Sequence, residues 1–461
     1  DGGLGIGDGG LGTGDWGHGG GIVDLLIRGG DVVTLDSGAE VLRGADVAVR
    51  DGVIVAVGDA GDGFQPAEVV DARDHLVLPG LFNGHTHSGT VLSRCLAVPE
   101  TWDPWFDLRY TQDGSLASEP GTPLTGDDAY WAALLAAAEM IRSGTVGFGD
   151  QYFFMDRVAE AVLASGLRAN LSWCTFGAES GEIGGDLAAV AAFVEKWQEA
   201  GDGRILTSFG PHSPYMCEPR FLARTAAVAA RLGVGIRLRL AESAEQVDFS
   251  LLAYDLTPVE VLDRNGVLDV PVVAAHAAYL SEVDMEILAT REASVIACPT
   301  VQRAAGLAAT PVAALLQAGV KVGVGTDGAG VAGTLDMLRA ARDLDAAGVD
   351  RLTALRLATR GSAQVLGFTN SGRLRAGACA DLILVDCRRP HLWPVGDPLC
   401  TAAEAIRGGD VTDVMVGGRW LMRGGRLTTI DEARVMAEAA ARAARLAGTR
   451  GLNFDSWGKS A

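Results

Sequence analysis

The sequence predicts an α/β fold, namely a (β/α)8 TIM barrel with a small β-sandwich domain formed from both chain ends. Three observations support this fold class. Apolar, strand-like runs alternate with helical stretches through the middle of the chain, and β-rich segments stand near each end. Polar, chemically reactive residues follow several of the apolar runs, at the positions where such a barrel carries its active site.

The two chain ends are expected to form the small domain. Short β-rich runs separated by Gly- and Asp-rich turns occupy Val23–Ile27, Val32–Leu35, Asp46–Val49 and Val53–Val57, and others follow at Asp381–Val385, Val411–Val416 and Arg419–Met422. The first 21 residues are so rich in glycine that they cannot offset their ordering entropy. The predicted division is a flexible extension (1–21), a composite β-sandwich (22–78 and 376–430), the barrel (79–375), and a C-terminal helix and tail (431–461).

The middle of the chain is expected to supply eight barrel strands. The first is the run Leu76–Phe82, which leads to His85, and the other seven are Val146–Phe153, Ala169–Phe176, Ile205–Gly210, Gly235–Ala241, Val270–Ala275, Ala293–Ala297 and Lys321–Gly325. Helices are expected between them. Thr125 and Asp128 resemble the start of a capping box, and Gly144 can end the helix that follows.

Composition limits the partners. The 461 residues include 38 Lys and Arg against 58 Asp and Glu, a formal net charge of −20. This balance argues against nucleic acid or an anionic membrane and favours a small-molecule substrate. No apolar run is long enough to span a bilayer and no signal segment opens the chain, so a cytoplasmic protein is expected. Seven scattered cysteines without a Cys-x-x-Cys pair fit reduced thiols.

Six reactive residues end the predicted strands. His85 and His87 are one residue apart, so along a strand both imidazoles point the same way, as a shared metal ion requires. The others are His212 after the fourth run, Glu242 after the fifth, His276 after the sixth and Asp327 after the eighth. Because the carboxyl ends of barrel strands meet on one face, these side chains are expected to form one site.

These segments resemble the amidohydrolase superfamily, in the branch that contains S-adenosylhomocysteine and methylthioadenosine deaminases and triazine chlorohydrolases. The resemblance extends from Ile22 to Gly448. It rests on Pro79–Leu81 followed by His85-Thr86-His87, and on Gly210–Tyr215, Leu240–Ser243, Ala275-His276, Cys298–Thr300 and Gly325–Ala329.

The resemblance implies one divalent metal ion, zinc or iron, with His85, His87 and Asp327 among its ligands. Such an ion lowers the pKa of a bound water, which then hydrolyses a C–N bond. In this scheme Asp327 accepts the proton of the water, Glu242 carries a proton to the departing nitrogen, and His276 stabilises the developing charge. Trp105 and His212 contact the substrate, and the resemblance also implies a homo-oligomer.

One position departs from the family pattern. The family places a further metal-binding histidine three residues before the glutamate, where this chain has Arg239. Arginine stays protonated and offers no lone pair, so it cannot replace imidazole as a ligand. Three outcomes follow. Arg239 turns aside and leaves a weakened metal site, or pairs with Asp327 or Glu242 and leaves the site without metal, or binds an anionic group of the substrate.

The leading hypothesis is a hydrolase that cleaves a C–N bond of a nitrogen heterocycle, by deamination with a metal-activated water. One competing hypothesis is a metal-poor relative that performs an isomerisation, elimination or cyclisation on an anionic substrate held by Arg239. The other is a catalytically silent binding protein. Retention of Glu242 and His276 favours an enzyme over a silent binder.

Overall fold

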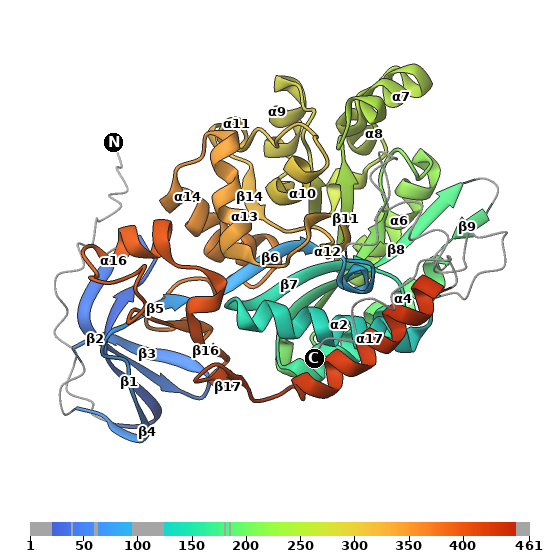
Figure 1. Ribbon diagram of the computed structural model, residues 1–461. Coiled ribbons are helices and arrows are strands. Elements are labelled where there is room, and N and C mark those ends of the chain that lie inside the picture. Colours follow the sequence, from blue (N-terminus) through green and yellow to red (C-terminus); the bar gives the residue numbers. More distant parts are fainter. Residues whose placement is uncertain are drawn as a thin grey trace, which may run out of the picture.

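The structure, a computed structural model, describes residues 21–37, 40–59, 63–94, 124–178, 181–183 and 186–448. Two sheets of nine strands each organise this part of the chain. Figure 1 shows the smaller β-domain, built from blue and red segments of the chain, beside the barrel. The predicted α/β barrel with a separate sheet from both ends is confirmed. The domain boundaries given above stay a prediction.

Eight parallel strands form the barrel, and each pairs with the next in the order β14-β13-β12-β11-β10-β8-β7-β6. Their bounds are β6 (Leu81–Thr86), β7 (Thr145–Tyr152), β8 (Arg168–Ala178), β10 (Ile205–Pro211), β11 (Gly235–Leu240), β12 (Val272–His276), β13 (Ser294–Ala297) and β14 (Lys321–Val324). The ninth strand, β9 (Gly181–Ile183), pairs with β8 in antiparallel fashion. Seven of the predicted runs therefore each correspond to one barrel strand, and the end of the first run begins β6.

The first and last barrel strands meet just beyond β14. The backbone N–H of Asp327 donates to the carbonyl of His85 at 3.0 Å. The Asn83 amide also joins these two strands. Its Nδ2 donates to Thr326 Oγ1 at 2.7 Å, and its Oδ1 accepts from Thr326 N at 3.1 Å. All of these groups are buried, so each satisfied donor and acceptor avoids a desolvation penalty and helps to fix the register of Asp327 against His85.

Helices connect the strands on the outside of the barrel (Figure 1). The helix after the first strand begins as predicted, because Thr125 and Asp128 form a complete capping box and Gly144 follows its end with φ +88°. The longer helices are α2 (Gly126–Arg142), α3 (Met155–Ser165), α4 (Leu187–Trp197), α6 (Pro219–Leu232), α7 (Ala244–Tyr254), α9 (Glu282–Thr290) and α17 (Glu432–Gly448), the last of which lies along α2.

The remaining helical segments are short. They are η1 (Ser88–Ser93), α5 (Ala200–Gly203), α8 (Pro258–Arg264), η2 (Val267–Asp269), α10 (Pro299–Ala304), α11 (Val312–Gln317), α12 (Ala329–Ala332), α13 (Met337–Asp343), η3 (Leu344–Ala347), α14 (Arg351–Arg356), η4 (Leu357–Gly361), α15 (Ser362–Val365), α16 (Pro398–Cys400), η5 (Thr401–Ala405) and η6 (Gly408–Asp410).

The small sheet joins both chain ends in the order β18-β17-β16-β15-β5-β1-β2-β3, with β4 also paired to β1. Its strands are β1 (Ile22–Val33), β2 (Val41–Arg50), β3 (Val53–Gly58), β4 (Gln65–Asp71), β5 (His75–Pro79), β15 (Leu382–Asp386), β16 (Val411–Val416), β17 (Arg419–Arg423) and β18 (Arg426–Leu427). The run Val23–Ile27 and the start of the run Val32–Leu35, predicted as separate strands, belong to the single long strand β1, which ends at Val33. Side chains from β1, β2, β3, β5, β15 and β16 bury one shared core, so the sheet curls around it.

The run Leu76–Phe82, predicted as one strand, divides at Gly80 between the two sheets. Its first part lies in β5 of the small sheet, and its second part begins β6 of the barrel. A Cβ at Gly80 would lie 2.2 Å from Val146 Cγ1, so only glycine lets the chain pass this close to β7. The sequence pattern missed this division because the apolar character continues across it.

Within the described ranges, no helix is long and apolar enough to cross a membrane.

Candidate active site

The barrel strands bring the predicted site residues together at their carboxyl ends. His85 lies in β6 and His87 directly follows it, Glu242 follows β11, His276 ends β12, and Asp327 lies three residues beyond β14. All five are buried. Trp105, predicted to contact the substrate, lies outside the described residues. The expectation that the strand-end residues share one site therefore agrees with their positions.

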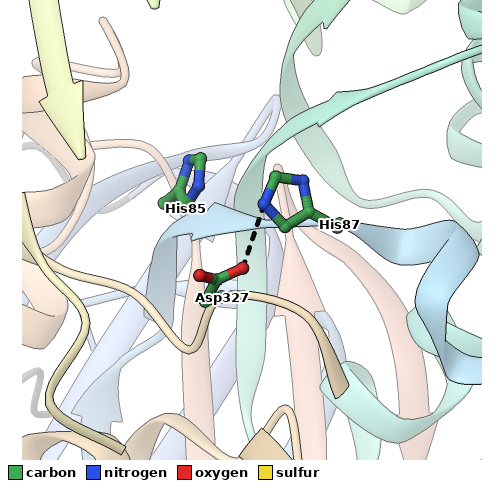
Figure 2. Close-up of side chains that lie close together, drawn as sticks. All are labelled: His85, His87 and Asp327. Atoms are coloured by element: carbon green, nitrogen blue, oxygen red, sulfur yellow. Dashed lines mark ion pairs between the residues drawn. The ribbon is translucent and has the colours of Figure 1, made fainter. Parts of the chain in front are cut away.

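Figure 2 shows His85, His87 and Asp327 facing one another. Each offers one ligand atom, and these three atoms lie within 4.8 Å of one another. The two imidazole rings stand edge to face with centroids 4.7 Å apart. His87 Nε2 lies 2.9 Å from Asp327 Oδ1. Two imidazoles and one carboxylate converging on a point form a donor set typical of zinc and related divalent ions.

His85 is available as a ligand. Its side chain is completely buried, and neither ring nitrogen has a hydrogen-bond partner among the described residues. Burial, assisted by the neighbouring His87, lowers the pKa of His85 well below 6.5. The ring is therefore neutral at physiological pH and carries a lone pair directed into the protein. A buried, unpartnered imidazole is costly unless something binds it, which fits a metal ligand.

The orientation of His87 is set by its other nitrogen. Nδ1 lies 2.5 Å from the carbonyl oxygen of Gln151, at the end of β7. Because a carbonyl only accepts, Nδ1 carries the proton, and Nε2 is the atom directed toward Asp327. This is the arrangement that holds metal-ligating histidines in a fixed tautomer.

Asp327 is the most highly connected group of the site. Its Oδ1 accepts from Gly328 N at 2.6 Å, and its Oδ2 lies 3.2 Å from His276 Nε2. Its backbone adopts φ +58°, a region that costs energy for a residue with a Cβ and that occurs often in functional sites. Burial acts to raise the pKa of Asp327, but Arg239 and His87 outweigh it and hold that pKa well below 3.8. The carboxylate is therefore ionised.

Arg239 points into this cluster. Its Nη2 lies 2.8 Å from Asp327 Oδ2 and 3.5 Å from Glu242 Oε1, and the side chain is about 6% exposed. Of the three arrangements considered for Arg239, this is pairing with Asp327. The ion pair satisfies two buried carboxylates, yet it also places a permanent positive charge beside a candidate metal ligand.

Glu242 and His276 form the other half of the site. His276 Nε2 lies 3.4 Å from Glu242 Oε1, and these two residues with Asp327 make a second group whose ligand atoms lie within 4.8 Å of one another. His276 has φ +70°, and its carbonyl accepts a hydrogen bond from Thr310 Oγ1. The strained turn therefore holds the imidazole between two carboxylates, where it can exchange protons with either.

His212 directly follows β10, the strand next to β11. Its Nδ1 is 3.1 Å from Ser213 Oγ, and its ring stacks on Phe176 at a centroid distance of 4.9 Å. The His212 carbonyl accepts from the N–H of Arg239 at 2.8 Å, which ties the end of β10 to β11. His391, which follows β15 of the small sheet, lies away from this site, and its Nε2 is 2.8 Å from Asp410 Oδ2.

The donor set fits a divalent ion through His85, His87 and Asp327. Three ligands of suitable chemistry converge, and the ring nitrogens of His85, which have no hydrogen-bond partner among the described residues, are suited to bind a metal. The guanidinium of Arg239 on Asp327 opposes that ion electrostatically. Pairing of Arg239 with Asp327 was expected to leave the site without metal. The guanidinium contacts Oδ2, however, while Oδ1 still faces His87, so the residues fit a metal with three ligands at reduced affinity.

Sequence reasoning missed two buried charged residues beneath the histidine pair. Asp150 in β7 is completely buried, and burial raises its pKa to about 6. Arg237 in β11 is equally buried, and burial lowers its pKa to about 10. Both lie within runs that were recognised as strands. Their charge in an apolar run was the available signal, because such residues are rarely buried without a purpose.

The model of the amidohydrolase family matches residues 76–421 of this chain. Among curated proteins, the 5-methylthioadenosine/S-adenosylhomocysteine deaminase of Pelotomaculum thermopropionicum is 38% identical over 443 residues, covering 92% of this chain and 99% of that protein. The deaminase of the same name from Moorella thermoacetica is 38% identical over 434 residues, covering 91% and 98%.

Solved structures with similar folds agree with the match to the amidohydrolase family. An adenosine deaminase from Xanthomonas campestris with bound zinc superposes with a TM-score of 0.86 at 30% identity, covering 94% of this chain and all of that one. An atrazine chlorohydrolase from Arthrobacter aurescens TC1, complexed with zinc, gives a TM-score of 0.80 at 24% identity, covering 91% and 100%. The second likeness concerns the fold alone. Together these comparisons confirm the family resemblance read from the sequence motifs.

Proposed function

Because the chain belongs to the amidohydrolase family and is a hydrolase that acts on C–N bonds, we propose that it deaminates a nitrogen heterocycle. In this reaction water replaces an exocyclic amino group, the ring gains an oxygen, and ammonia leaves. The observation that carries the proposal is the convergence of Glu242, His276 and Asp327 beside the histidine pair. The similarity to curated deaminases supports hydrolysis over the non-hydrolytic and silent alternatives.

We further propose one divalent metal ion, zinc or iron, with His85, His87 and Asp327 as its protein ligands. Their clustered donor atoms and the neutral imidazole of His85 support this assignment. The zinc reported in the related adenosine deaminase supports it as well. When bound, such an ion lowers the pKa of water and makes it nucleophilic near neutral pH.

The proposed proton transfers use groups already in contact. Asp327 is ionised, so its carboxylate can accept a proton from the attacking water. Glu242 delivers a proton to the departing nitrogen, which leaves as ammonia. His276 Nε2, between the two carboxylates, stabilises the charge that develops on the ring.

Trp105, His212 and Arg239 are the proposed substrate-binding residues. Arg239 is paired with Asp327, so it reaches a substrate only if it exchanges that partner for another anion. An acidic group on the substrate would provide one, and its binding would release Asp327 for the metal. This coupling favours a heterocycle that carries a carboxylate or phosphate. Cytoplasmic location and homo-oligomeric assembly stay predictions.

The test is ammonia release from zinc-supplemented protein with aminopurine nucleosides and amino-substituted triazines, each with and without an acidic substituent. The Glu242→Gln variant should lose about a hundredfold or more in kcat, the usual effect of removing a general acid. His391→Gln, outside the barrel, should retain full activity. Ammonia release that is equal in the Glu242→Gln variant and the wild type would contradict the proposed role of Glu242.

A further inference from the structure

A buried pair of opposite charges lies beneath the histidine pair and has no part in the proposed proton transfers. Asp150 belongs to β7, and Arg237 belongs to β11, two residues before Arg239. Since alternate residues of a strand share a face, Arg237 points into the barrel interior, as Arg239 does. Both charged side chains are essentially inaccessible to solvent.

Arg237 reaches across the barrel to the first strand. In the order of the sheet, β11 is separated from β6 by β7, β8 and β10. Even so, Arg237 Nη1 donates to the Gly84 carbonyl at 2.7 Å. Gly84 directly precedes His85, so this hydrogen bond fixes the peptide unit that carries the first histidine.

Asp150 holds the other side of the same segment. Its Oδ1 accepts from Ser88 N at 3.1 Å, and its Oδ2 accepts from Ser88 Oγ. Ser88 directly follows His87, whose Nδ1 donates to the carbonyl of Gln151, the residue after Asp150. The three residues from His85 to His87 are thus held at one end by Arg237 and at the other by Asp150, two buried residues of opposite charge.

The space around the pair is filled. A Cβ at Gly149 would lie 2.6 Å from Arg237 Nη2 and 2.6 Å from the Gly84 carbonyl oxygen. Arg237 therefore has little freedom to move. Moreover, Nε and Nη2 of Arg237 lack a hydrogen-bond partner within the part of the chain that the structure describes. A buried guanidinium with unsatisfied N–H groups contributes little to the stability of the fold, because apolar residues of similar volume in its place often give equal or greater stability.

We propose that Arg237 and Asp150 are positioning residues that fix His85 and His87 in the geometry required to bind a divalent metal ion. The inference rests on the proposed metal-dependent function. Arg237 acts through the Gly84 carbonyl and Asp150 acts through Ser88, so neither touches the metal or the substrate. Groups that orient metal ligands in this way commonly change metal affinity by about ten- to a hundredfold when removed.

Three variants isolate the two contacts. Arg237→Met keeps the length of the side chain but cannot donate to Gly84, whereas Arg237→Lys keeps a donor. Ser88→Ala removes the hydroxyl contact with Asp150 and leaves the backbone contact. The matched control is Arg168→Met, which breaks a buried ion pair elsewhere, the one in which Arg168 Nε lies 2.7 Å from Asp381 Oδ2 between the barrel and the small sheet.

The measurements are zinc affinity of metal-stripped protein, by competition with a chromophoric chelator, and the visible absorption spectrum of the cobalt-substituted protein. Arg237→Met should bind zinc about tenfold or more weakly and change the cobalt spectrum, and Ser88→Ala should weaken zinc binding about threefold. Arg237→Lys should stay close to wild type. Arg168→Met should lower the melting temperature but leave zinc affinity and the cobalt spectrum unchanged.

Unchanged zinc affinity and cobalt spectrum in Arg237→Met would overturn the inference. An equal loss of zinc affinity in the Arg168→Met control would overturn it as well. If Arg237→Met fails to fold, the zinc affinity of Ser88→Ala is compared with that of wild type, and equal affinities overturn the inference. If wild-type affinity is too weak to measure, the same series is made in the Arg239→His background, and failure to bind zinc there also overturns the inference. Zinc binding that depends on the pair without ammonia release would contradict only the proposed deamination.

Discussion

Replacement of Arg239 by histidine should convert a weak metal site into a strong one. In the structure the guanidinium lies 2.8 Å from Asp327 Oδ2, so a metal ion on the same carboxylate would lie about 5 Å from the guanidinium carbon. At an effective dielectric constant of about 20, a dication and a unit charge at that distance repel by about 6 to 7 kcal/mol. Movement of Arg239 to about 8 Å reduces this repulsion to about 4 kcal/mol.

The expected gain in zinc affinity for Arg239→His is therefore about a thousandfold to a hundred-thousandfold, before any contribution from the new ligand. Competition against chelators of graded affinity measures it. Arg239→Gln provides the matched control, since it removes the charge without supplying a metal ligand, and its affinity should lie between those of wild type and Arg239→His. Equal zinc affinity in all three proteins would refute the electrostatic argument.

Three further predictions concern stability. The folded-state pKa of Asp150 is about 6 against an ordinary 3.8, so wild type loses about 3 kcal/mol of stability as the pH rises through that interval. In urea unfolding, Asp150→Asn should therefore be more stable than wild type by up to about 3 kcal/mol at pH 8, and this difference should disappear below pH 4. A stability difference that does not change with pH would contradict the prediction. Asn83→Ala should lower the free energy of unfolding by about 1–3 kcal/mol, because Thr326 N is left buried and unpaired. A decrease below about 0.5 kcal/mol would show that the contact between the first and last barrel strands does not depend on this amide. Thr125→Ala should lower the free energy of unfolding, also measured by urea unfolding, by about 1 kcal/mol, because the helix cap is lost. Wild-type stability in this variant would show that Asp128 caps the helix alone.

Much of the site was predictable because its residues end parallel strands. His85, His87, Glu242, His276 and Asp327 each follow an apolar run, and the barrel architecture brings the ends of such runs to one face. Apart from the first run, the bounds of the barrel strands were predicted to within about two residues for the same reason. Hydrophobic periodicity reports which segments are buried in the barrel, and the topology then determines where their ends meet.

Other features depend on side-chain geometry that the sequence pattern does not contain. The choice of Asp327 as the partner of Arg239 follows from the rotamers of both residues, so the sequence left three arrangements open. The contact of Arg237 with Gly84 crosses the barrel between strands far apart in the sheet. The division of the first run at Gly80 was missed because its apolar character is continuous, and only the proximity of Val146 reveals it.

The most direct test of the central claim, that His85, His87 and Asp327 hold a catalytic metal, is equilibrium dialysis against graded zinc with elemental analysis of both compartments. Wild type should bind about one zinc ion per chain at saturating zinc, and Asp327→Ala should bind none, since three protein ligands and open positions are typical of catalytic zinc. Binding of no zinc by wild type, or of equal zinc by the Asp327→Ala variant, would contradict the account.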